Sequence, residues 1–172
     1  MDCMYTDEYI SINGSICPSK KENNIYNFLK VINPSVGEKV LLVGDIGNYG
    51  KYLNKLGVEV TIFWIEKEID TLALAKNCSC NVIKGNLEYM PFKDEYFDKV
   101  IFLNAFNSFD DEQRVFDEIC RVLRKNGNIV IQERDPKSLE VRLTTLKRKT
   151  LGYKCKFYYP NEIDSVMQKM DV

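Results

Sequence analysis

The sequence predicts an α/β fold in which a doubly wound, mostly parallel sheet carries helices on both faces. Three observations support this prediction. Apolar runs of strand length recur along the chain, stretches with helical spacing separate them, and glycines directly follow the first run. Parallel strands are apolar throughout because helices cover both of their faces. The 172 residues suffice for one domain with a substantial core, so we expect residues 1–172 to form a single domain.

The first part of the chain predicts a hairpin and a helix. Tyr9–Cys17 alternates in period two around Asn13-Gly14, which is typical of a type I′ hairpin. Ser19 and Glu22 have the spacing of a capping box ahead of a helix, and Asn33-Pro34 should end that helix. Its expected apolar face consists of Ile25, Phe28, Leu29 and Ile32.

A strand, a glycine turn, a helix and a second strand follow. The strand Val40–Val43 leads into Gly44, Gly47 and Gly50, and Gly57 should end the helix that begins near Tyr49. The second strand, Val58–Ile65, ends at Glu66, about twenty residues after the first glycine. This layout is typical of a nucleotide-binding βαβ unit, in which glycines admit the ligand to the backbone and the acid accepts hydrogen bonds from ribose hydroxyls. The alternatives are a simple tight turn and an acid that stabilises a helix start.

The remaining elements continue the alternation. We expect a helix over Ile69–Lys76, strands over Asn81–Lys84, Asp98–Asn104 and Asn128–Gln132, and a turn-rich connection over Gly85–Pro91. The spacing predicts a helix that Asp110 caps and Gly127 closes, with Cys120 on its apolar face. We expect Trp64 in the core. Towards the end we expect a basic helix over Ser138–Thr150, a strand over Tyr153–Tyr158 and a helix after Pro160.

Composition narrows the classes of function. The chain has no histidine, which removes the usual zinc ligand, the His-dependent nucleophiles and the commonest general base. We expect free thiols in a reducing compartment, with a metal or disulfide at Cys78 and Cys80 as the alternative. The start of the chain does not resemble a signal peptide, and no apolar run has membrane-spanning length. We therefore expect a cytoplasmic protein without a membrane partner or a metal.

Four segments carry a resemblance to a known family. They are VLLVGDIG, WIEKEIDTLALAK, VIKGNLEYMPFKDEYFDKVIF and FDEICRVLRKNGNIVIQERD. With these segments the chain resembles the class I S-adenosylmethionine-dependent methyltransferases, specifically the ubiquinone/menaquinone-biosynthesis-like type 11 group. The resemblance covers roughly Glu22–Asp135. It implies a Rossmann-like methyltransferase fold with a cofactor-binding core over residues 19–135, an N-terminal hairpin or lid over 1–18 and a shortened C-terminal part over 136–172.

The resemblance also implies a cofactor and its contacts. The cofactor would be S-adenosylmethionine, with S-adenosylhomocysteine as the product. Glu66 would bind the ribose, Asn86 the adenine amine, and the Leu87 backbone N–H the adenine ring. Taken alone, Asn86 is equally typical of a turn. The implied cofactor-binding residues are Gly44, Asp45, Gly47, Glu66, Lys67, Asn86, Leu87 and Leu103, and no catalytic residue is implied.

The chain departs from the family pattern at four points. Leu42 stands where the first strand usually ends in an acid, Ile46 interrupts the usual Gly-x-Gly, and Asn86 replaces the commoner Asp. The chain also ends where the family continues into two more strands. Two functions therefore remain: an active methyltransferase, and a methyltransferase-like binding or partner subunit without catalysis. A dinucleotide-dependent oxidoreductase is a more distant alternative, because the stricter Gly-x-Gly-x-x-Gly is missing.

The acceptor is expected to be a small molecule. Methyl transfer needs few catalytic side chains, because the sulfonium is already a good leaving group and the protein mainly aligns the nucleophile. The Asn/Asp-Pro-Pro-aromatic motif of amino-methyltransferases is missing, and Asn104-Ala105-Phe106-Asn107 stands in its place. A basic run predicts a solvated face, with contact to an anion or to RNA, a nucleic acid, as the alternative. It comprises Arg142, Lys147, Arg148, Lys149, Lys154 and Lys156.

One edge of the predicted sheet needs a cover. The strand around Ile129–Gln132 would otherwise offer unpaired backbone groups to other chains. Tyr153–Tyr158 is the preferred partner, because it follows the fifth strand without a long crossing. The hairpin Tyr9–Cys17 would then lie over the ligand site as a lid, or pair with a second subunit in a homodimer.

Overall fold

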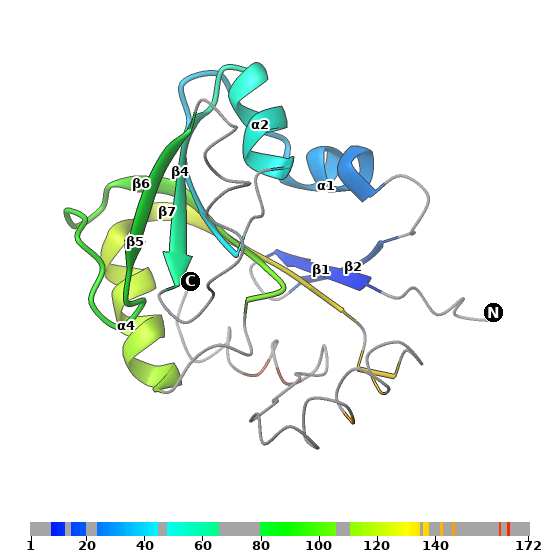
Figure 1. Ribbon diagram of the computed structural model, residues 1–172. Coiled ribbons are helices and arrows are strands. Elements are labelled where there is room, and N and C mark those ends of the chain that lie inside the picture. The colour runs from blue at the N-terminus through cyan, green and yellow to red at the C-terminus, as the bar shows by residue number, and fades with distance from the viewer. Residues whose placement is uncertain are drawn as a thin grey trace.

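A single seven-stranded sheet organises the molecule. The computed structural model describes residues 8–12, 15–19, 24–44, 48–65, 80–105, 111–134 and 136–137, together with the single residues Arg142, Leu146, Glu162 and Ser165. The strands lie in the order β2-β1-β7-β6-β3-β4-β5 (Figure 1). Their bounds are β1 Glu8–Ile12, β2 Ser15–Ser19, β3 Lys39–Val43, β4 Glu59–Ile65, β5 Asn81–Gly85, β6 Phe97–Leu103 and β7 Leu123–Arg134. The described helices are α1 Asn24–Ile32, α2 Asn48–Lys55 and α4 Glu112–Val122.

Five of the strands form the parallel, doubly wound core that the sequence predicts. β3 pairs in parallel with β4 and β6, β4 pairs with β5, and β6 pairs with β7. The chain builds β3, β4 and β5 in one direction and then returns to the other side of β3 for β6. The predicted fold class is therefore confirmed.

Each face of the sheet has its own apolar core, because successive strand residues point to opposite sides. On one face Leu42 and Ile101 pack with Phe28 and Ile32 of α1 and Leu53 of α2. On the other face the sheet packs against the apolar side of α4, which consists of Val115, Phe116, Ile119 and Val122. Trp64 is buried as expected. Helices thus cover both faces (Figure 1).

The N-terminal hairpin belongs to the sheet. β1 and β2 pair antiparallel across the two residues Asn13 and Gly14, as the alternation predicts. β1 also pairs antiparallel with β7, with Ile10 opposite Gln132. The expectation that Tyr153–Tyr158 covers this edge, with the hairpin left as a lid, is therefore wrong, whereas contact of the hairpin with a second subunit stays a prediction. Tyr153–Tyr158 lies outside the described residues. The sequence pattern could not decide between the two segments, because both alternate and backbone pairing is nearly independent of residue identity.

Charged side chains connect the amino-terminal ends of β3 and β6. Lys99 is buried in β6, and its ammonium group donates a hydrogen bond to the Glu38 carboxylate just before β3. The Asp98 carboxylate accepts a hydrogen bond from the Lys39 backbone N–H at 2.8 Å and pairs with Arg124. Removing one partner of such a buried pair is costly, because it leaves the other charge uncompensated. These contacts fix the register of the two central strands.

Several predicted boundaries shift. Asp111 caps α4, where the sequence indicated Asp110, and its side chain accepts a hydrogen bond from the Arg114 N–H at 3.3 Å. α4 ends at Val122, well before Gly127, because the carbonyls of Arg121 and Val122 accept hydrogen bonds from the N–H groups of Glu95 and Tyr96, both at 2.8 Å.

Two further predictions are wrong, and the predicted ends of two helices are confirmed. Ser19 lies in β2, not at a helix cap. Cys120 is exposed, not core, because it lies outside the apolar stripe of α4. The ends of α1 and α2 agree with prediction. The chain turns left-handed at Asn33, where φ is 42°, and at Gly57, where φ is 82°.

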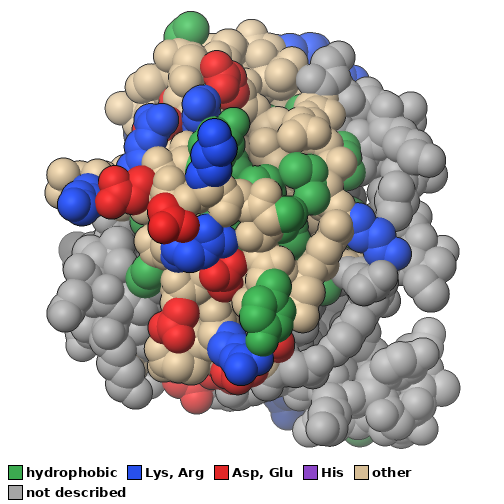
Figure 2. Space-filling view, turned by 90° about the vertical axis from the view of Figure 1, so that its left-hand side faces the viewer, with side chains coloured by type: hydrophobic (Ala, Val, Ile, Leu, Met, Phe, Trp, Pro, Cys, Tyr) green, Lys and Arg blue, Asp and Glu red, His purple; other side chains and the backbone are tan. Residues whose placement is uncertain are grey.

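The described surface carries both basic and acidic side chains. Figure 2 shows basic and acidic side chains interspersed over one face of the molecule. Two ion pairs lie within α4 and its cap, Arg114–Asp111 and Arg121–Glu118. Two others reach the loop before β6: Arg121–Asp94 from α4 and Lys125–Glu95 from the segment after it. No helix among the described residues is long and apolar enough to cross a membrane.

The hairpin predicts a specific effect of truncation. Deleting residues 1–19 removes β1 and β2 and exposes the edge of β7, whereas deleting residues 1–7 leaves both strands in place. We expect the longer deletion to lower the melting temperature and to promote association, because an open edge pairs with other chains. The shorter deletion should behave as the full chain. Differential scanning calorimetry and light scattering measure both effects, and a longer deletion that melts and scatters like the full chain would contradict the pairing.

Candidate functional site

The carboxyl ends of the parallel strands meet at a topological switch point. The strand order reverses between β3 and β6, because the chain returns to the other side of β3 for β6, so the carboxyl ends of these two strands mark the switch point of the sheet. Open α/β sheets bind their ligands in this place. Of the residues predicted to bind a ligand, Gly44 directly follows β3, Leu103 ends β6, and Asn86 and Leu87 follow β5. The structure thus brings these residues to one edge of the sheet.

Gly44 stands at the centre of the site. Its φ is 81°, in the left-handed region that residues with a side chain rarely adopt. A Cβ built there would lie 2.5 Å from the Leu103 carbonyl oxygen and 2.8 Å from the Ala105 Cβ. The turn after β3 therefore packs directly against the end of β6, and only glycine fits.

Asn86 begins a tight turn at the end of β5. Its carboxamide oxygen accepts a hydrogen bond from the Glu88 N–H at 2.9 Å, and its carbonyl accepts one from the Tyr89 N–H at 3.1 Å. The turn reading of Asn86 is thus correct. An adenine contact is compatible with it, because an amide oxygen has two lone pairs. Leu87 is buried in the core beneath this turn and anchors it.

Arg121 clamps the loop after Asn86 onto α4. Its guanidinium group donates to the carbonyl oxygens of Met90 at 3.0 Å and Phe92 at 2.8 Å, and to the carboxylates of Glu118 and Asp94 at 2.7–2.8 Å. Glu118 also accepts a hydrogen bond from the Met90 N–H at 2.7 Å. The hydrogen bond with Arg121 lowers the pKa of Glu118 most strongly, and the same bond raises the pKa of Arg121. Both groups therefore stay charged, and the loop is held at a fixed distance from the sheet.

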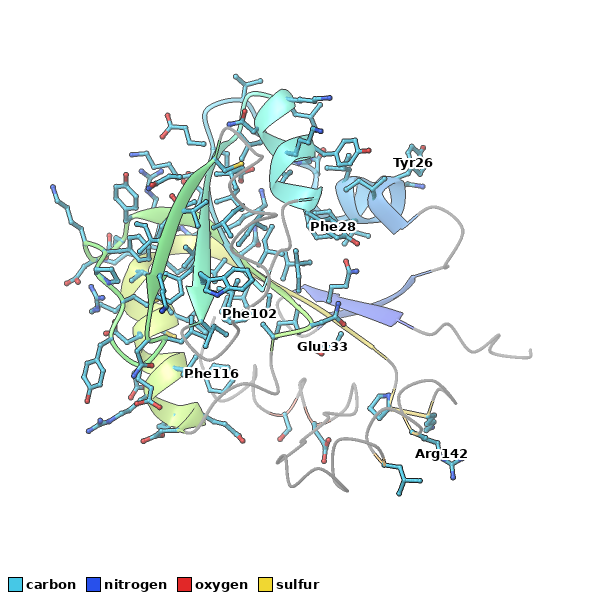
Figure 3. All side chains as sticks on the ribbon, in the orientation of Figure 1. Tyr26, Phe28, Phe102, Phe116, Glu133 and Arg142 are labelled. Carbon is cyan, nitrogen blue, oxygen red and sulfur yellow. The ribbon has the colours of Figure 1, made fainter. Side chains whose placement is uncertain are left out.

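A second polar cluster lies on the β6–β7 side of the site, and the sequence analysis missed it. Gln132 is buried at the end of β7 and donates a hydrogen bond to the Tyr49 hydroxyl of α2 at 3.0 Å. Asn104 follows β6, and its N–H donates to the Gln132 carbonyl at 2.8 Å. Glu133, the next residue of β7, is also buried, and Figure 3 shows it near the end of that strand. The sequence does contain a signal for this cluster, because a polar residue directly follows each of two apolar runs: Asn104 after Leu103, and Gln132 after Ile131.

Aromatic packing holds Tyr49 in this cluster. The rings of Tyr49 and Phe28 meet edge to face, with their centroids 4.5 Å apart. Phe28 is fully buried, and Figure 3 shows it on the side of α1 towards α2. The hydroxyl of Tyr49 therefore reaches Gln132 from a fixed ring, because edge-to-face pairs have a preferred geometry. Helices α1 and α2 and strand β7 are joined through these three side chains.

Four of the predicted cofactor-binding residues lie outside the described residues: Asp45, Gly47, Glu66 and Lys67. Ile65 ends β4 and pairs with Gly85, so the chain reaches the same edge directly before Glu66. Leu42, at the position of the usual family acid, is buried against α1 and α2. Within the described parts of the chain, no group of three or more acidic, cysteine or histidine side chains is arranged to hold a metal ion.

Comparison with known proteins agrees with this geometry. A family model described as a methyltransferase domain, of type 11, matches residues 43–131. A demethylmenaquinone methyltransferase of Thermotoga maritima is 28% identical over 118 residues, which are 67% of this chain and 50% of that protein. A ubiquinone/menaquinone biosynthesis C-methyltransferase of Wigglesworthia glossinidia brevipalpis is 30% identical over 122 residues, which are 64% of this chain and 47% of that protein. The chain thus spans about half the length of these curated relatives.

Solved structures share the fold. An S-adenosylmethionine-dependent methyltransferase of Thermotoga maritima, described as a possible histamine N-methyltransferase, superposes with a TM-score of 0.66 at 25% identity, over 85% of this chain and 68% of that one. A phosphoethanolamine N-methyltransferase of Haemonchus contortus, solved with S-adenosyl-L-methionine, gives 0.65 at 20% identity, over 87% of this chain and 36% of that one. The family match covers the glycine turn, the Asn86 turn and strands β4 to β6. The chain therefore belongs to the type 11 methyltransferase domain family.

Proposed function

We propose that this chain binds S-adenosylmethionine at the carboxyl ends of β3 to β6 and transfers its methyl group to a small-molecule acceptor, with S-adenosylhomocysteine as the product. The observation that carries the proposal is Gly44, a left-handed glycine pressed against the end of β6 at the switch point. It lies inside the region that matches the methyltransferase domain. A Cβ-free turn at this position suits the close approach of a ligand to the backbone.

The spacing of the strands suits the length of the cofactor. β3 and β5 are separated by β4, and neighbouring strands lie about 4.8 Å apart, so Gly44 and Asn86 are about 10 Å apart across the strands. Val43 is level with Phe63 and Ile83, so Asn86 also lies two residues, about 7 Å, further along the strand direction than Gly44. An adenosine group at Asn86 would then bring its ribose to the end of β4, where Glu66 follows, and its amino-acid part to Gly44. The turn at Asn86 and the Arg121 clamp would hold the adenine side rigid.

The chemistry asks little of the side chains. The bound cofactor supplies a methyl group on a positively charged sulfur, which is already a good leaving group. The chain contributes alignment, because holding a nucleophile in line with the methyl carbon removes much of the entropic barrier. Rigid strand ends at β3 and β6 are suited to this task, and no histidine or metal is required. One relative is named a ubiquinone/menaquinone biosynthesis C-methyltransferase, whereas two structural neighbours are described as a possible histamine N-methyltransferase and a phosphoethanolamine N-methyltransferase, so the acceptor class is a separate question.

Ligand binding is the direct test. At a concentration of S-adenosylhomocysteine one hundred times its dissociation constant, the fold should gain about 2.7 kcal/mol of stability. The melting temperature should then rise by about 5–10 °C in a chain of this length. NAD is the matched control, because a dinucleotide-dependent oxidoreductase would respond to it instead. An unchanged melting temperature in millimolar S-adenosylhomocysteine would refute cofactor binding, whereas binding without methyl transfer to any acceptor would favour the inactive partner subunit.

Glu66 should contribute to cofactor affinity. If its carboxylate accepts hydrogen bonds from the ribose, Glu66→Ala should weaken binding of S-adenosylhomocysteine by about 1.5–3 kcal/mol, the range for hydrogen bonds to a charged group. Glu68→Ala removes a nearby carboxylate and should leave the affinity unchanged. Calorimetric titration of the two variants and the parent gives the comparison. Equal affinities in all three would assign Glu66 to a helix start instead.

The Arg121 clamp should affect both stability and binding. Arg121→Met removes hydrogen bonds to two carbonyls and two carboxylates, so we expect a loss of about 1–3 kcal/mol in unfolding free energy. The affinity for S-adenosylhomocysteine should also fall, because the Asn86 turn is no longer held. Lys125→Met, which removes an exposed cation after the same helix, is the control.

At acid pH, the difference in unfolding free energy between the parent and Arg121→Met should become smaller. The pKa of Glu118 is lowered in the fold, so its contribution to stability is complete above its ordinary pKa of about 4.3 and is lost as the pH falls through the lowered value. The stability gap between the parent and Arg121→Met should therefore shrink below about pH 4.3. Urea unfolding at several pH values measures this. A gap that is constant down to the acid limit would show that the Glu118 bond contributes nothing.

A further inference from the structure

Asn104 occupies an unusual backbone position at the switch point. It is the first residue after β6, and its φ is 53°, in the left-handed region. Its N–H donates to the Gln132 carbonyl at 2.8 Å, which ties it to the end of β7. Asparagine tolerates this conformation better than most residues. Strained backbone of this kind clusters at functional sites, where the surrounding structure enforces it.

The side chain of Asn104 carries a buried acceptor. Its Oδ1 atom is shielded from solvent, and no group in the described parts of the chain donates a hydrogen bond to it. The nearby carboxamide of Gln132 donates to Tyr49 instead, at 3.0 Å. Buried polar atoms are hydrogen-bonded in the great majority of native proteins, and an unsatisfied one is costly. The Oδ1 atom is therefore suited to a donor that arrives with a ligand.

The position of Asn104 in the fold indicates which part of a bound ligand could donate this hydrogen bond. The next residue, Ala105, has its Cβ 2.8 Å from where a Cβ of Gly44 would stand. The backbone after β3 therefore touches the backbone after β6, and Asn104 stands between the two β6-side residues, Leu103 and Ala105, that make this contact. Under the proposed function, the amino-acid part of the cofactor lies over Gly44, and the methyl group and the acceptor meet beside it.

We propose that the Asn104 carboxamide oxygen accepts a hydrogen bond from the reacting atom of the acceptor, which is an amine nitrogen or a hydroxyl oxygen. This inference rests on the proposed function and names its substrate class. The lone pair of that nitrogen or oxygen forms the new bond to the methyl carbon, while the carbon–sulfur bond breaks and its electron pair stays on sulfur. The proton held towards Asn104 then leaves to water. A reacting carbon offers no comparable donor, so carbon acceptors are disfavoured.

Two cofactor analogues test this without knowledge of the acceptor. S-adenosylhomocysteine lacks the methyl group that is transferred. Sinefungin carries an amine at the position of this methyl group, so it presents N–H donors where the methyl group would meet the acceptor. Both share the same α-amino group. Asn104→Gly removes the side chain and keeps the left-handed backbone. We expect it to weaken sinefungin binding about tenfold, the effect of one charge-assisted hydrogen bond, and to change S-adenosylhomocysteine binding by less than about twofold.

Two further variants serve as controls. Asn104→Asp keeps an acceptor oxygen at the same place and should retain the affinity for sinefungin. Asn126→Gly makes the same change at another left-handed asparagine, φ 64°, in the stretch between α4 and the part of β7 that pairs with β1, and should alter neither affinity. Thermal melts show that each variant is folded, and calorimetric titration gives the dissociation constants.

The outcomes separate the inference from the proposed function. Failure of the parent chain to bind S-adenosylhomocysteine would refute the proposed function itself. If the parent binds and Asn104→Gly weakens both ligands equally, the oxygen serves the shared α-amino group of the cofactor, and the inference is overturned. If Asn104→Gly weakens neither, the oxygen faces no ligand group, and the inference is overturned as well. Selective loss of sinefungin, restored in Asn104→Asp, supports it.

Discussion

The contact between Gly44 and the end of β6 is the constraint on which the site depends. A side chain at Gly44 would collide with the Leu103 carbonyl and with Ala105, so only glycine lets β3 and β6 end side by side. The parallel pairing of these two strands creates the switch point, and their amino ends are fastened separately by Lys99, Glu38 and Asp98. Both ends of this strand pair are thus fixed, and so is the switch point at which open α/β sheets bind ligands.

The sheet obtains its antiparallel edge from the start of the chain. In the family, the strands beyond the fifth follow it in sequence. Here β1 and β2 precede the parallel core and cover β7, with β1 antiparallel to β7. The edge of a sheet is satisfied by any extended segment that reaches it with the right direction, because the pairing uses backbone groups. The architecture is kept while the source of its last two strands differs.

Two different supports position the two sides of the site. On the β5 side, the loop after Asn86 is held by Arg121 and Glu118 of α4. On the β6–β7 side, Asn104 and Gln132 extend directly from strand ends, and Tyr49 of α2 accepts a hydrogen bond from Gln132. Groups on strand ends are held more precisely than groups on loops. This arrangement is suited to methyl transfer, in which alignment at the reacting centre matters most.

The sequence by itself determined the parallel core, the glycine turn and the turn at Asn86, because these follow from local patterns: apolar runs, helical spacing and residues suited to left-handed backbone. It also indicated the family. It did not determine the end of α4, since the N–H groups of Glu95 and Tyr96, distant in sequence, bind the last carbonyls of that helix, and it did not predict that Cys120 is exposed. Only the tertiary structure placed β1 beside β7 and brought Asn104, Gln132 and Tyr49 together. The physical reason is that strand pairing and polar clusters join segments far apart in the chain, and neither leaves a periodic signal in either segment alone.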